Sequence, residues 1–297
     1  MENWKTHLFK MQDVLFDENK IANFPIKQNL GTEFHDTKPK GANLRELSDS
    51  SDMTQSTWEF PDYVKILKAY LSPQNNGICA DLGCGDGRFV KCLIDFGFNK
   101  IIAVESHYNS LLSLSNYLDE TNDHDKVLLV KSSVETLPFK DNVLDTFMSI
   151  NVFYYLNENQ GIAISEAYRV LKKDGVGIST YHNYEAILLR SLVFNGIKDF
   201  LTVLAKQNYR EVKDEKSPYR FNTQEPDKEE NLYKNIGFEI CDVKGISLFH
   251  QFLHYIQKEN PDSESLLKEN KALLFSFFNY LSLNSQLQKT KIIKLKK

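Results

Sequence analysis

Short apolar runs alternate with segments of helical spacing through the middle of the chain. Residues 78–82, 101–105, 127–130 and 176–181 are apolar runs of strand length, and helical patterns lie between them. Parallel strands joined by helices must be covered on both faces, so such strands are apolar throughout rather than alternating. The pattern of residues 77–181 therefore predicts an α/β core with a parallel sheet between helices.

The pattern changes on both sides of this core. The N-terminal stretch is polar and irregular, and it predicts short helices and a crossing loop before a helix that begins near Tyr63. After residues 176–181, which form the fifth predicted strand (the fourth precedes Tyr154), the regular alternation gives way to helical and polar stretches. We expect four parts: an N-terminal cap or lid segment at 1–57, the ligand-binding core at 58–182, a helical cap insertion at 183–224, and the end of the core at 225–297 with a further helical insertion at 247–286.

The last part contains two further predicted strands. Residues 237–243 follow a short helical pattern and have the apolar spacing of a strand. Residues 291–295 alternate lysine with apolar residues, which predicts a final strand with a solvated edge rather than a polyanion-binding tail. We expect the insertions and the N-terminal segment to cover the carboxyl edge of the sheet, where open α/β sheets bind ligands.

A glycine-rich turn follows the first predicted strand. It carries Asp81, Gly83, Gly85 and Gly87, and a helical pattern begins directly after it. A strand, a tight turn and a helix N-terminus let backbone N–H groups meet a nucleotide-like ligand, and glycine allows the required backbone angles. A dinucleotide loop would have its third glycine where Arg88 stands, and the Gly-Lys-Ser/Thr of a phosphate loop is absent. Asp81 is placed to meet a cationic amino group.

A second acid supports this interpretation. Glu105 ends the next predicted strand, about 20 residues beyond the loop, where a carboxylate is expected to accept both hydroxyls of a ribose. A glycine turn alone also closes ordinary surface loops. The acid at the expected distance favours a ligand-binding loop.

Four motifs in order resemble one enzyme family: the glycine-rich loop, the strand that ends in Glu105, and two later stretches at 137–145 and 166–175. The D-x-G-x-G-x-G loop at 81–87 resembles motif I of class I S-adenosylmethionine (SAM) methyltransferases. Residues 137–145 resemble the LPF-x-D signature of their type-11, UbiE-like branch, and residues 166–175 resemble its E-x-x-RVLK helix and turn. The resemblance implies a Rossmann-like, seven-stranded, mostly parallel sheet with an antiparallel seventh strand, helices on both faces and a helical cap. It also implies SAM as cofactor and S-adenosyl-L-homocysteine as product.

The same resemblance implies a set of cofactor-binding positions. They are Asp81, Gly83, Cys84, Gly85, Gly87, Glu105, Ser106, Ser133, Val134 and Ile150. Ser133 stands where the family has an acid at the edge of the adenine, so adenine contact is expected to rest more on the Val134 backbone. Tyr154 and Tyr155 replace a histidine pair that is common after the fourth strand, which affects the reaction.

Candidate catalytic residues lie after strands four and five. His182 follows strand five, and an imidazole pKa suits proton transfer near neutrality, although a histidine there can also cap a loop. Tyr155 is the second candidate, through hydrogen bonding or pocket shape. His250 and His254 are four residues apart but have no evident third ligand, so we expect a cap helix and no metal.

Composition narrows the possible partners. A net charge of −4 without an evident basic patch argues against nucleic acid as a partner. The four cysteines form no CxxC pair, and no signal peptide or membrane span is evident, so we expect a cytoplasmic protein with reduced thiols. We predict methylation of a small molecule, of aromatic or apolar character, at oxygen or nitrogen. A tRNA-base methyltransferase and a non-catalytic activating subunit stay open as alternatives, as does a homodimer.

Overall fold

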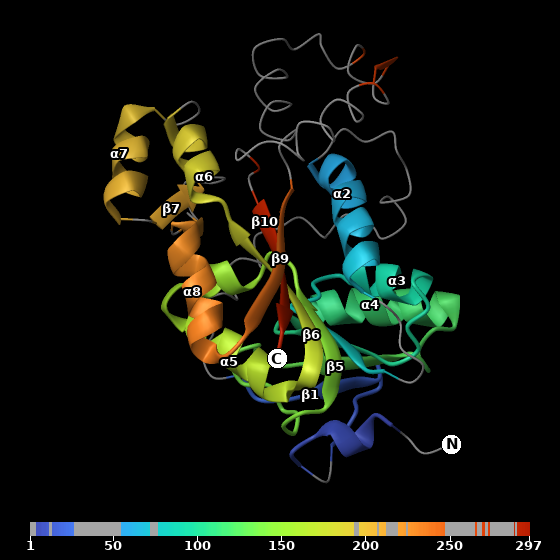
Figure 1. Ribbon diagram of the computed structural model, residues 1–297. Coiled ribbons are helices and arrows are strands. Elements are labelled where there is room, and N and C mark those ends of the chain that lie inside the picture. Colours follow the sequence, from blue (N-terminus) through green and yellow to red (C-terminus); the bar gives the residue numbers. More distant parts are fainter. Residues whose placement is uncertain are drawn as a thin grey trace.

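An eight-stranded mixed sheet forms the centre of the protein (Figure 1). The computed structural model describes residues 4–11, 14–26, 55–71, 77–192, 196–206, 208–211, 219–223, 225–246 and 290–297, with single positions 265, 269, 270, 273 and 288. The strands, in their order across the sheet, are β1 (Ile21–Asn23), β4 (Val127–Lys131), β3 (Ile101–Glu105), β2 (Cys79–Leu82), β5 (Leu144–Ser149), β6 (Leu171–His182), β10 (Thr290–Lys296) and β9 (Glu239–Ile246).

Strand direction follows the predicted fold class. All pairs from β1 to β6 are parallel, and β10 is antiparallel to both of its neighbours, β6 and β9. The Rossmann-like, mostly parallel sheet with an antiparallel last strand is therefore confirmed. The sheet has one strand more than expected, because β1 adds to the edge beside β4.

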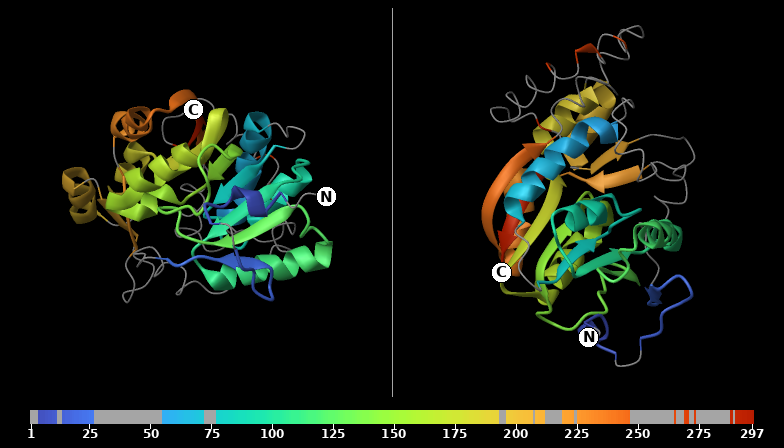
Figure 2. Two further views of the ribbon diagram at one scale, coloured as in Figure 1. Left: turned by 90° about the horizontal axis from the view of Figure 1, so that it is seen from below. Right: turned by 90° about the vertical axis from the view of Figure 1, so that its right-hand side faces the viewer.

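Helices cover both faces of the sheet (Figures 1 and 2). One face carries α2 (Gln55–Tyr70), α3 (Arg88–Asp95) and α4 (Tyr108–Thr121), and the other carries α5 (Gln160–Val170) and α8 (Pro226–Ile236). The remaining described elements are η1 (Thr6–Leu8), η3 (Phe153–Asn159), α6 (Tyr184–Arg190), α7 (Ile197–Lys206) and the hairpin of β7 (Asn208–Glu211) with β8 (Tyr219–Asn222).

Successive strand residues enter two separate cores. In β3, Ile102 and Val104 pack with α5, while Ile101 and Ala103 pack with α3 and α4. The two layers explain why the parallel strands are apolar at every position, since each face meets a helix. The two cores together hold the carboxyl ends of the strands in place.

The N-terminal segment binds the edge and the amino end of the sheet. β1 pairs with β4, and Lys10 N–H donates to the Pro138 carbonyl at 2.9 Å. Lys5 Nζ donates to the carbonyl of Val127, the first residue of β4, at 2.7 Å. Lys5 therefore lies at the amino end of the sheet, whereas β1 pairs with the last three residues of β4 and ends beside the carboxyl end of that edge strand. Residues 27–54 lie outside the described residues.

The basic tail forms an interior strand. β10 lies between β6 and β9, so it is covered on both sides and has no solvated edge, which corrects that part of the prediction. Thr290 pairs with both His182 and Ile246, so β9 ends and β10 begins beside the end of β6. The expected helical insertion at 247–286, with His250 and His254, lies almost wholly outside the described residues.

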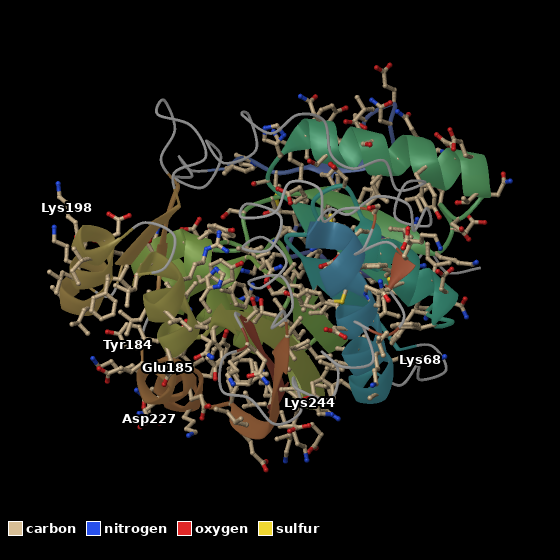
Figure 3. All side chains as sticks on the ribbon, turned by 90° about the horizontal axis from the view of Figure 1, so that it is seen from above. Lys68, Tyr184, Glu185, Lys198, Asp227 and Lys244 are labelled. Carbon is tan, nitrogen blue, oxygen red and sulfur yellow. The ribbon has the colours of Figure 1, made fainter. Side chains whose placement is uncertain are left out.

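The cap insertion contains an element that the sequence did not predict. The hairpin of β7 and β8 occupies part of a stretch that looked merely polar. The helices α6 and α7 both lie within residues 183–224, where the sequence predicted a helical insertion. Viewed from above, Tyr184 and Glu185 of α6 lie on the opposite side of the sheet end from Lys68 of α2 (Figure 3).

A single arginine joins the two motifs of the type-11 signature. Arg169 donates from Nη1 to the Phe139 carbonyl at 2.8 Å and to Asp141 at 2.6 Å, and from Nη2 to the Leu137 carbonyl at 3.1 Å. It also binds Glu166 through Nε at 2.7 Å, and Glu166 in turn accepts the Leu137 N–H at 2.9 Å. The arginine thus sets the path of the chain after β4.

We expect Arg169→Ala to lower the free energy of unfolding by about 2–4 kcal/mol, because it leaves Glu166 and two carbonyls without their donor. The matched control is Lys91→Ala, which removes only the exposed i,i+4 pair with Asp95 and should cost about 0.5 kcal/mol or less. Urea denaturation measures both. Equal losses in the two variants would contradict this role of Arg169.

Candidate functional site

The strand order brings the predicted ligand residues to one edge of the sheet. β2 leads to β3 and β4 on one side, while β5 and β6 lie on the other side of β2. Open α/β sheets bind ligands at such a reversal of strand order, outside the carboxyl ends of the strands. Asp81, Glu105 and Ile150 lie at or just beyond three of these ends.

The glycine-rich loop has the backbone conformation that the sequence predicted. Gly83, Gly85 and Gly87 have φ angles of 86°, 53° and 90°, in the left-handed region. A Cβ at Gly83 would collide with the side chain of Val152, and one at Gly87 with Leu114. A Cβ at Gly85 would meet nothing within 4 Å. Bare backbone at Gly85 therefore faces open space, as a ligand cradle requires.

The carboxylate of Glu105 joins two loops. Its Oε2 accepts the Gly85 N–H at 2.9 Å. Its Oε1 accepts the N–H groups of Ser106 at 2.7 Å and His107 at 3.0 Å, and the Ser106 hydroxyl at 3.0 Å. A carboxylate offers about four lone-pair sites. With only one of the four bonds on Oε2, this oxygen has capacity for a further donor, such as a hydroxyl.

Asp81 is a buried carboxyl group with an unused oxygen. Its side chain is 1% exposed, and Oδ2 has no hydrogen-bond partner. Burial, followed by repulsion from Glu105, raises the pKa of Asp81 from 3.8 to about 8. A buried acid without a donor is costly, and it suits a cationic partner supplied by a ligand.

The loop after β4 holds the predicted adenine-side residues. Ser133 and Val134 are buried, with exposed fractions of 5% and 6%. The Ser133 hydroxyl donates to Glu135 Oε2 at 2.8 Å and accepts the Glu135 N–H at 3.2 Å. The serine thus stabilises the turn, and it brings the carboxylate of Glu135 close to the position where the family has an acid. Sequence reasoning missed Glu135 because it is shifted by two residues.

Three aromatic rings lie together at the ends of β5 and β6. The ring centres of His182 and Tyr154 are 4.1 Å apart, and those of Tyr154 and Tyr155 are 4.5 Å apart. His182 is 4% exposed and Tyr154 is 2% exposed. The structure therefore brings the two predicted catalytic residues, His182 and Tyr155, into one cluster through Tyr154. Ile187 and Val203 of the cap pack against it.

Asn151 was missed by the sequence reasoning. It follows Ile150 after β5 and has φ 61°, an uncommon conformation that asparagine tolerates. Its N–H donates to Thr180 Oγ1 at 2.7 Å, and its Oδ1 accepts the Tyr63 hydroxyl at 3.2 Å. Helix α2 is thereby tied to the loop after β5. An asparagine directly after a predicted strand is the signal that could have found it.

The comparison with protein families agrees with this geometry. A family model described as a methyltransferase domain matches residues 80–179, the segment that carries β2 to β6 and their loops. Residues 80–179 therefore carry a methyltransferase domain of the type-11 family. The match covers the predicted cofactor residues and leaves out His182 and the cap.

Two curated relatives match parts of this methyltransferase. An uncharacterized protein of Methanocaldococcus jannaschii is 25% identical over 181 residues, which is 56% of this chain and 73% of the relative. An uncharacterized chloroplastic methyltransferase of Arabidopsis thaliana is 27% identical over 125 residues, 41% of this chain and 35% of that protein. The chain thus spans about a third of the plant relative.

Solved structures share the fold at low identity. A protein of Pyrococcus horikoshii has a TM-score of 0.58 and 15% identity, covering 89% of this chain and 98% of that one. A candidate SAM-dependent methyltransferase of Listeria monocytogenes has a TM-score of 0.55 and 12% identity, and the match covers 82% of this chain and 99% of that one. A complex of a methyltransferase activator with a candidate methyltransferase of Haloferax volcanii has a TM-score of 0.53 and 15% identity, and the match covers 85% of this chain and 92% of that one. These likenesses show the fold alone.

Two further findings concern the described residues. None of the described helices is long and apolar enough to cross a membrane. Within the same residues, no group of three His, Cys, Asp or Glu side chains lies together as a metal site. The donor set fits SAM instead: an unpartnered buried carboxyl group for an ammonium, a carboxylate with spare capacity for hydroxyls, and bare backbone at Gly85.

We expect Asp81→Asn to stabilise the ligand-free methyltransferase while weakening SAM binding. The folded pKa of about 8 lies above the ordinary 3.8, so the folded state binds more protons and stability falls as pH rises between these values. Asparagine removes this loss, so the gain in Tm over wild type should grow from pH 5 to pH 8. Asp86→Asn, in the same loop, is the control. A gain that does not depend on pH would refute this account.

We expect Glu105→Ala to weaken S-adenosylhomocysteine binding by about 1–3 kcal/mol, because ribose hydroxyls and the Gly85 N–H lose their acceptor. Glu105→Gln keeps one oxygen and should lose less. Glu239→Ala, on the exposed strand β9, is the matched control and should bind as wild type does. Calorimetry that finds unchanged affinity in Glu105→Ala would remove Glu105 from the ribose site.

Proposed function

We propose that this methyltransferase transfers the methyl group of SAM to an oxygen or nitrogen atom of a small aromatic or apolar molecule. The observation that carries the proposal is the ring cluster of His182, Tyr154 and Tyr155 at the same sheet edge as the glycine loop. It combines a group that can accept a proton with an apolar surface that can hold an acceptor.

The cofactor-binding roles follow from the polar groups of the site. Asp81 would bind the amino group, Glu105 and Ser106 the ribose, and Ser133 with the Val134 backbone the adenine. Gly83, Cys84, Gly85 and Gly87 would provide the backbone cradle, and Ile150 would pack against the bound molecule. SAM supplies a methyl group on a positively charged sulfur, which makes the methyl electrophilic.

His182 and the tyrosines would act on the acceptor. Methyl transfer is an in-line displacement in which the bond from carbon to sulfur breaks as the bond from carbon to the acceptor forms, so alignment supplies much of the rate. A hydroxyl or a protonated amine must also lose a proton, and His182 would take it. Tyr154 orients the imidazole by ring contact. The buried position of His182 keeps water from competing.

Apolar side chains of the cap support an apolar acceptor. Tyr184 and Ile187 of α6 and Val203 of α7 form one buried cluster with Tyr154. Five of the ten exposed large apolar side chains in the described part of the chain lie on the same two helices and the residues beside them: Leu189, Leu192, Ile197, Leu201 and Leu204. Single exposed apolar residues are ordinary, whereas a cluster of this kind marks a binding surface.

The alternatives make different demands. Methylation of a tRNA base calls for clustered positive charge, and the net charge of −4 speaks against it. A non-catalytic subunit has no need of the Asp81 and Glu105 arrangement. The proposal places the enzyme in the cytoplasm, which keeps thiols reduced, and all four cysteines are free.

The deciding experiment uses SAM labelled in the methyl group. The protein is incubated with cell extract separated into small molecules and RNA, and the label is followed into each fraction. Label in an organic-soluble small molecule supports the proposal. Label in RNA alone would establish the tRNA alternative. No transfer, together with intact S-adenosylhomocysteine binding, would favour the activating subunit.

We expect His182→Ala to lower kcat by roughly 10²–10⁴ and to leave SAM affinity nearly unchanged, because the base acts on the acceptor. The wild-type pH–rate profile should fall on its acid side as the base becomes protonated, and the variant should lack this fall. Tyr155→Phe removes only the hydroxyl of the second candidate, and it should keep the pH dependence that His182→Ala loses. Near-normal kcat and an unaltered profile in His182→Ala would exclude His182 as the base.

A further inference from the structure

Helix α8 begins beside the ring cluster. The helix lies against α5 (Figure 1). Burial, followed by the negative charge of Glu225, the residue that precedes α8, raises the pKa of the Tyr184 hydroxyl. Tyr184 shares one buried cluster with Tyr154. The first turn of α8 is therefore a neighbour of the candidate acceptor site.

This first turn contains a buried acid. Glu229 is 1% exposed. Gln160, the first residue of α5, donates from Nε2 to Glu229 Oε1 at 2.9 Å and to Oε2 at 3.3 Å. Burial raises the pKa of the Glu229 carboxyl group, and the hydrogen bond from Gln160 offsets part of this rise. Neither the cofactor site nor the proton transfer proposed above uses this acid.

Three buried oxygen atoms on neighbouring elements lack a hydrogen-bond partner in the described part of the chain. They are Gln160 Oε1, Thr223 Oγ1 and Asn157 Oδ1. The side chains of Gln160 and Thr223 are 2% and 1% exposed. Buried polar atoms are nearly always hydrogen-bonded in folded proteins, so three such atoms near one buried acid call for a partner. All three are oxygens that accept, so the partner must donate.

The fold brings these atoms to one place. Gln160 begins α5 three residues after Asn157, which belongs to η3. Strand β8 lies against η3, and Thr223 follows β8 directly. The Glu225 carbonyl accepts the Glu229 N–H at 3.2 Å, so Thr223 comes just before the turn that holds Glu229. The ends of η3 and β8 and the starts of α5 and α8 therefore meet around the buried acid.

The backbone of Asn157 is strained. It has φ 49° and ψ −114°, a combination outside the usual left-handed region. Its Nδ2 donates to the Tyr155 carbonyl at 3.1 Å. Strained residues persist where the surrounding structure holds them, and they gather at functional sites. Asn157 thus joins the polar group of side chains to the loop that carries the ring cluster.

A primary ammonium group has the matching chemistry. It offers three N–H donors and no acceptor, and it carries one positive charge. The donors match oxygens that only await a donor, and the charge matches the Glu229 carboxylate, because hydrogen bonds between ionised groups are the strong ones. An ammonium nitrogen has no lone pair, so while it is bound in this way it cannot receive a methyl group.

We propose that Glu229, Gln160 and Thr223 bind a primary ammonium group of the methyl acceptor, and that a different oxygen or nitrogen atom of the acceptor is methylated. This inference rests on the proposed function and narrows its acceptors to aromatic or apolar amines. The ammonium anchors one end of the molecule beside α8, and the ring cluster with His182 meets the other end.

Two probe molecules test the anchor. Tyramine carries a phenol hydroxyl and a primary ammonium, and 4-ethylphenol has the same ring and hydroxyl without the ammonium. Calorimetry measures the affinity of each for the full chain saturated with S-adenosylhomocysteine. The wild-type chain should bind tyramine about 10–100-fold more tightly than 4-ethylphenol, as expected for hydrogen bonds to a charged group.

Two variants remove parts of the anchor, and a third is the control. Glu229→Gln keeps the shape and removes the charge, so it should abolish the preference for tyramine and change the affinity for 4-ethylphenol by less than about 3-fold. Thr223→Val removes one hydroxyl and should reduce the preference by about 3–10-fold. Glu230→Gln, at the next position of α8, where the acid accepts the Tyr181 hydroxyl at 3.2 Å, should leave the preference unchanged. Thermal unfolding confirms that each variant is folded.

Each other outcome overturns the inference. Equal affinities of the wild-type chain for the two probes would mean that no ammonium site exists, while leaving an aromatic acceptor in place. Equal losses for both probes in Glu229→Gln would make the acid a link between α5 and α8 only. The same loss of preference in Glu230→Gln would reduce the effect to general attraction of a cation. If the chain binds S-adenosylhomocysteine but neither probe, the aromatic acceptor of the proposed function fails, and this inference fails with it.

Discussion

The candidate site depends on parallel pairing of the central strands. Because β2, β3, β4 and β5 run in the same direction, the residues that follow them all emerge at one edge. The Glu105 carboxylate then ties the ends of two strands together through Gly85. If the strand pairing shifted by one residue, the Glu105 side chain would point into a core covered by helices. Its carboxylate would find no hydrogen-bond donors there.

The same edge concentrates groups that are unfavourable without a ligand. Among the described residues, the buried Asp81 has an unused oxygen and the Arg88 guanidinium has no hydrogen-bond acceptor, and Asn151 has a left-handed backbone conformation. Strain and unsatisfied polar groups persist only where the surroundings hold them and where function gains from them. The two cores beneath the edge provide the compensating stability, and Arg169 fixes the loop after β4.

The cap has a different role from the core. The core elements match the family model, while α6, α7 and the β7–β8 hairpin lie beyond the matched residues. The ring cluster forms where the two parts meet, since Tyr154 comes from the loop after β5 and Ile187 from α6. We propose that acceptor choice rests on these added elements, because function lies in sites built onto a shared fold.

The sequence by itself determined the parallel core of the sheet and the glycine-rich turn after β2. Apolar runs, the spacing of Gly83, Gly85 and Gly87, and the acid at Glu105 are local signals, since each reflects a backbone angle or a strand end that a few residues decide.

Only the tertiary structure decided how distant segments meet. β1 on the sheet edge, β10 in its interior, the link from Tyr63 to Asn151 and the rings around Arg88 all join residues far apart in the chain. Such contacts depend on the packing of whole elements, and a local pattern carries no record of the partner. For the same reason the sequence could not show that β1 pairs with the last three residues of β4, while Lys5 binds the first residue of that strand.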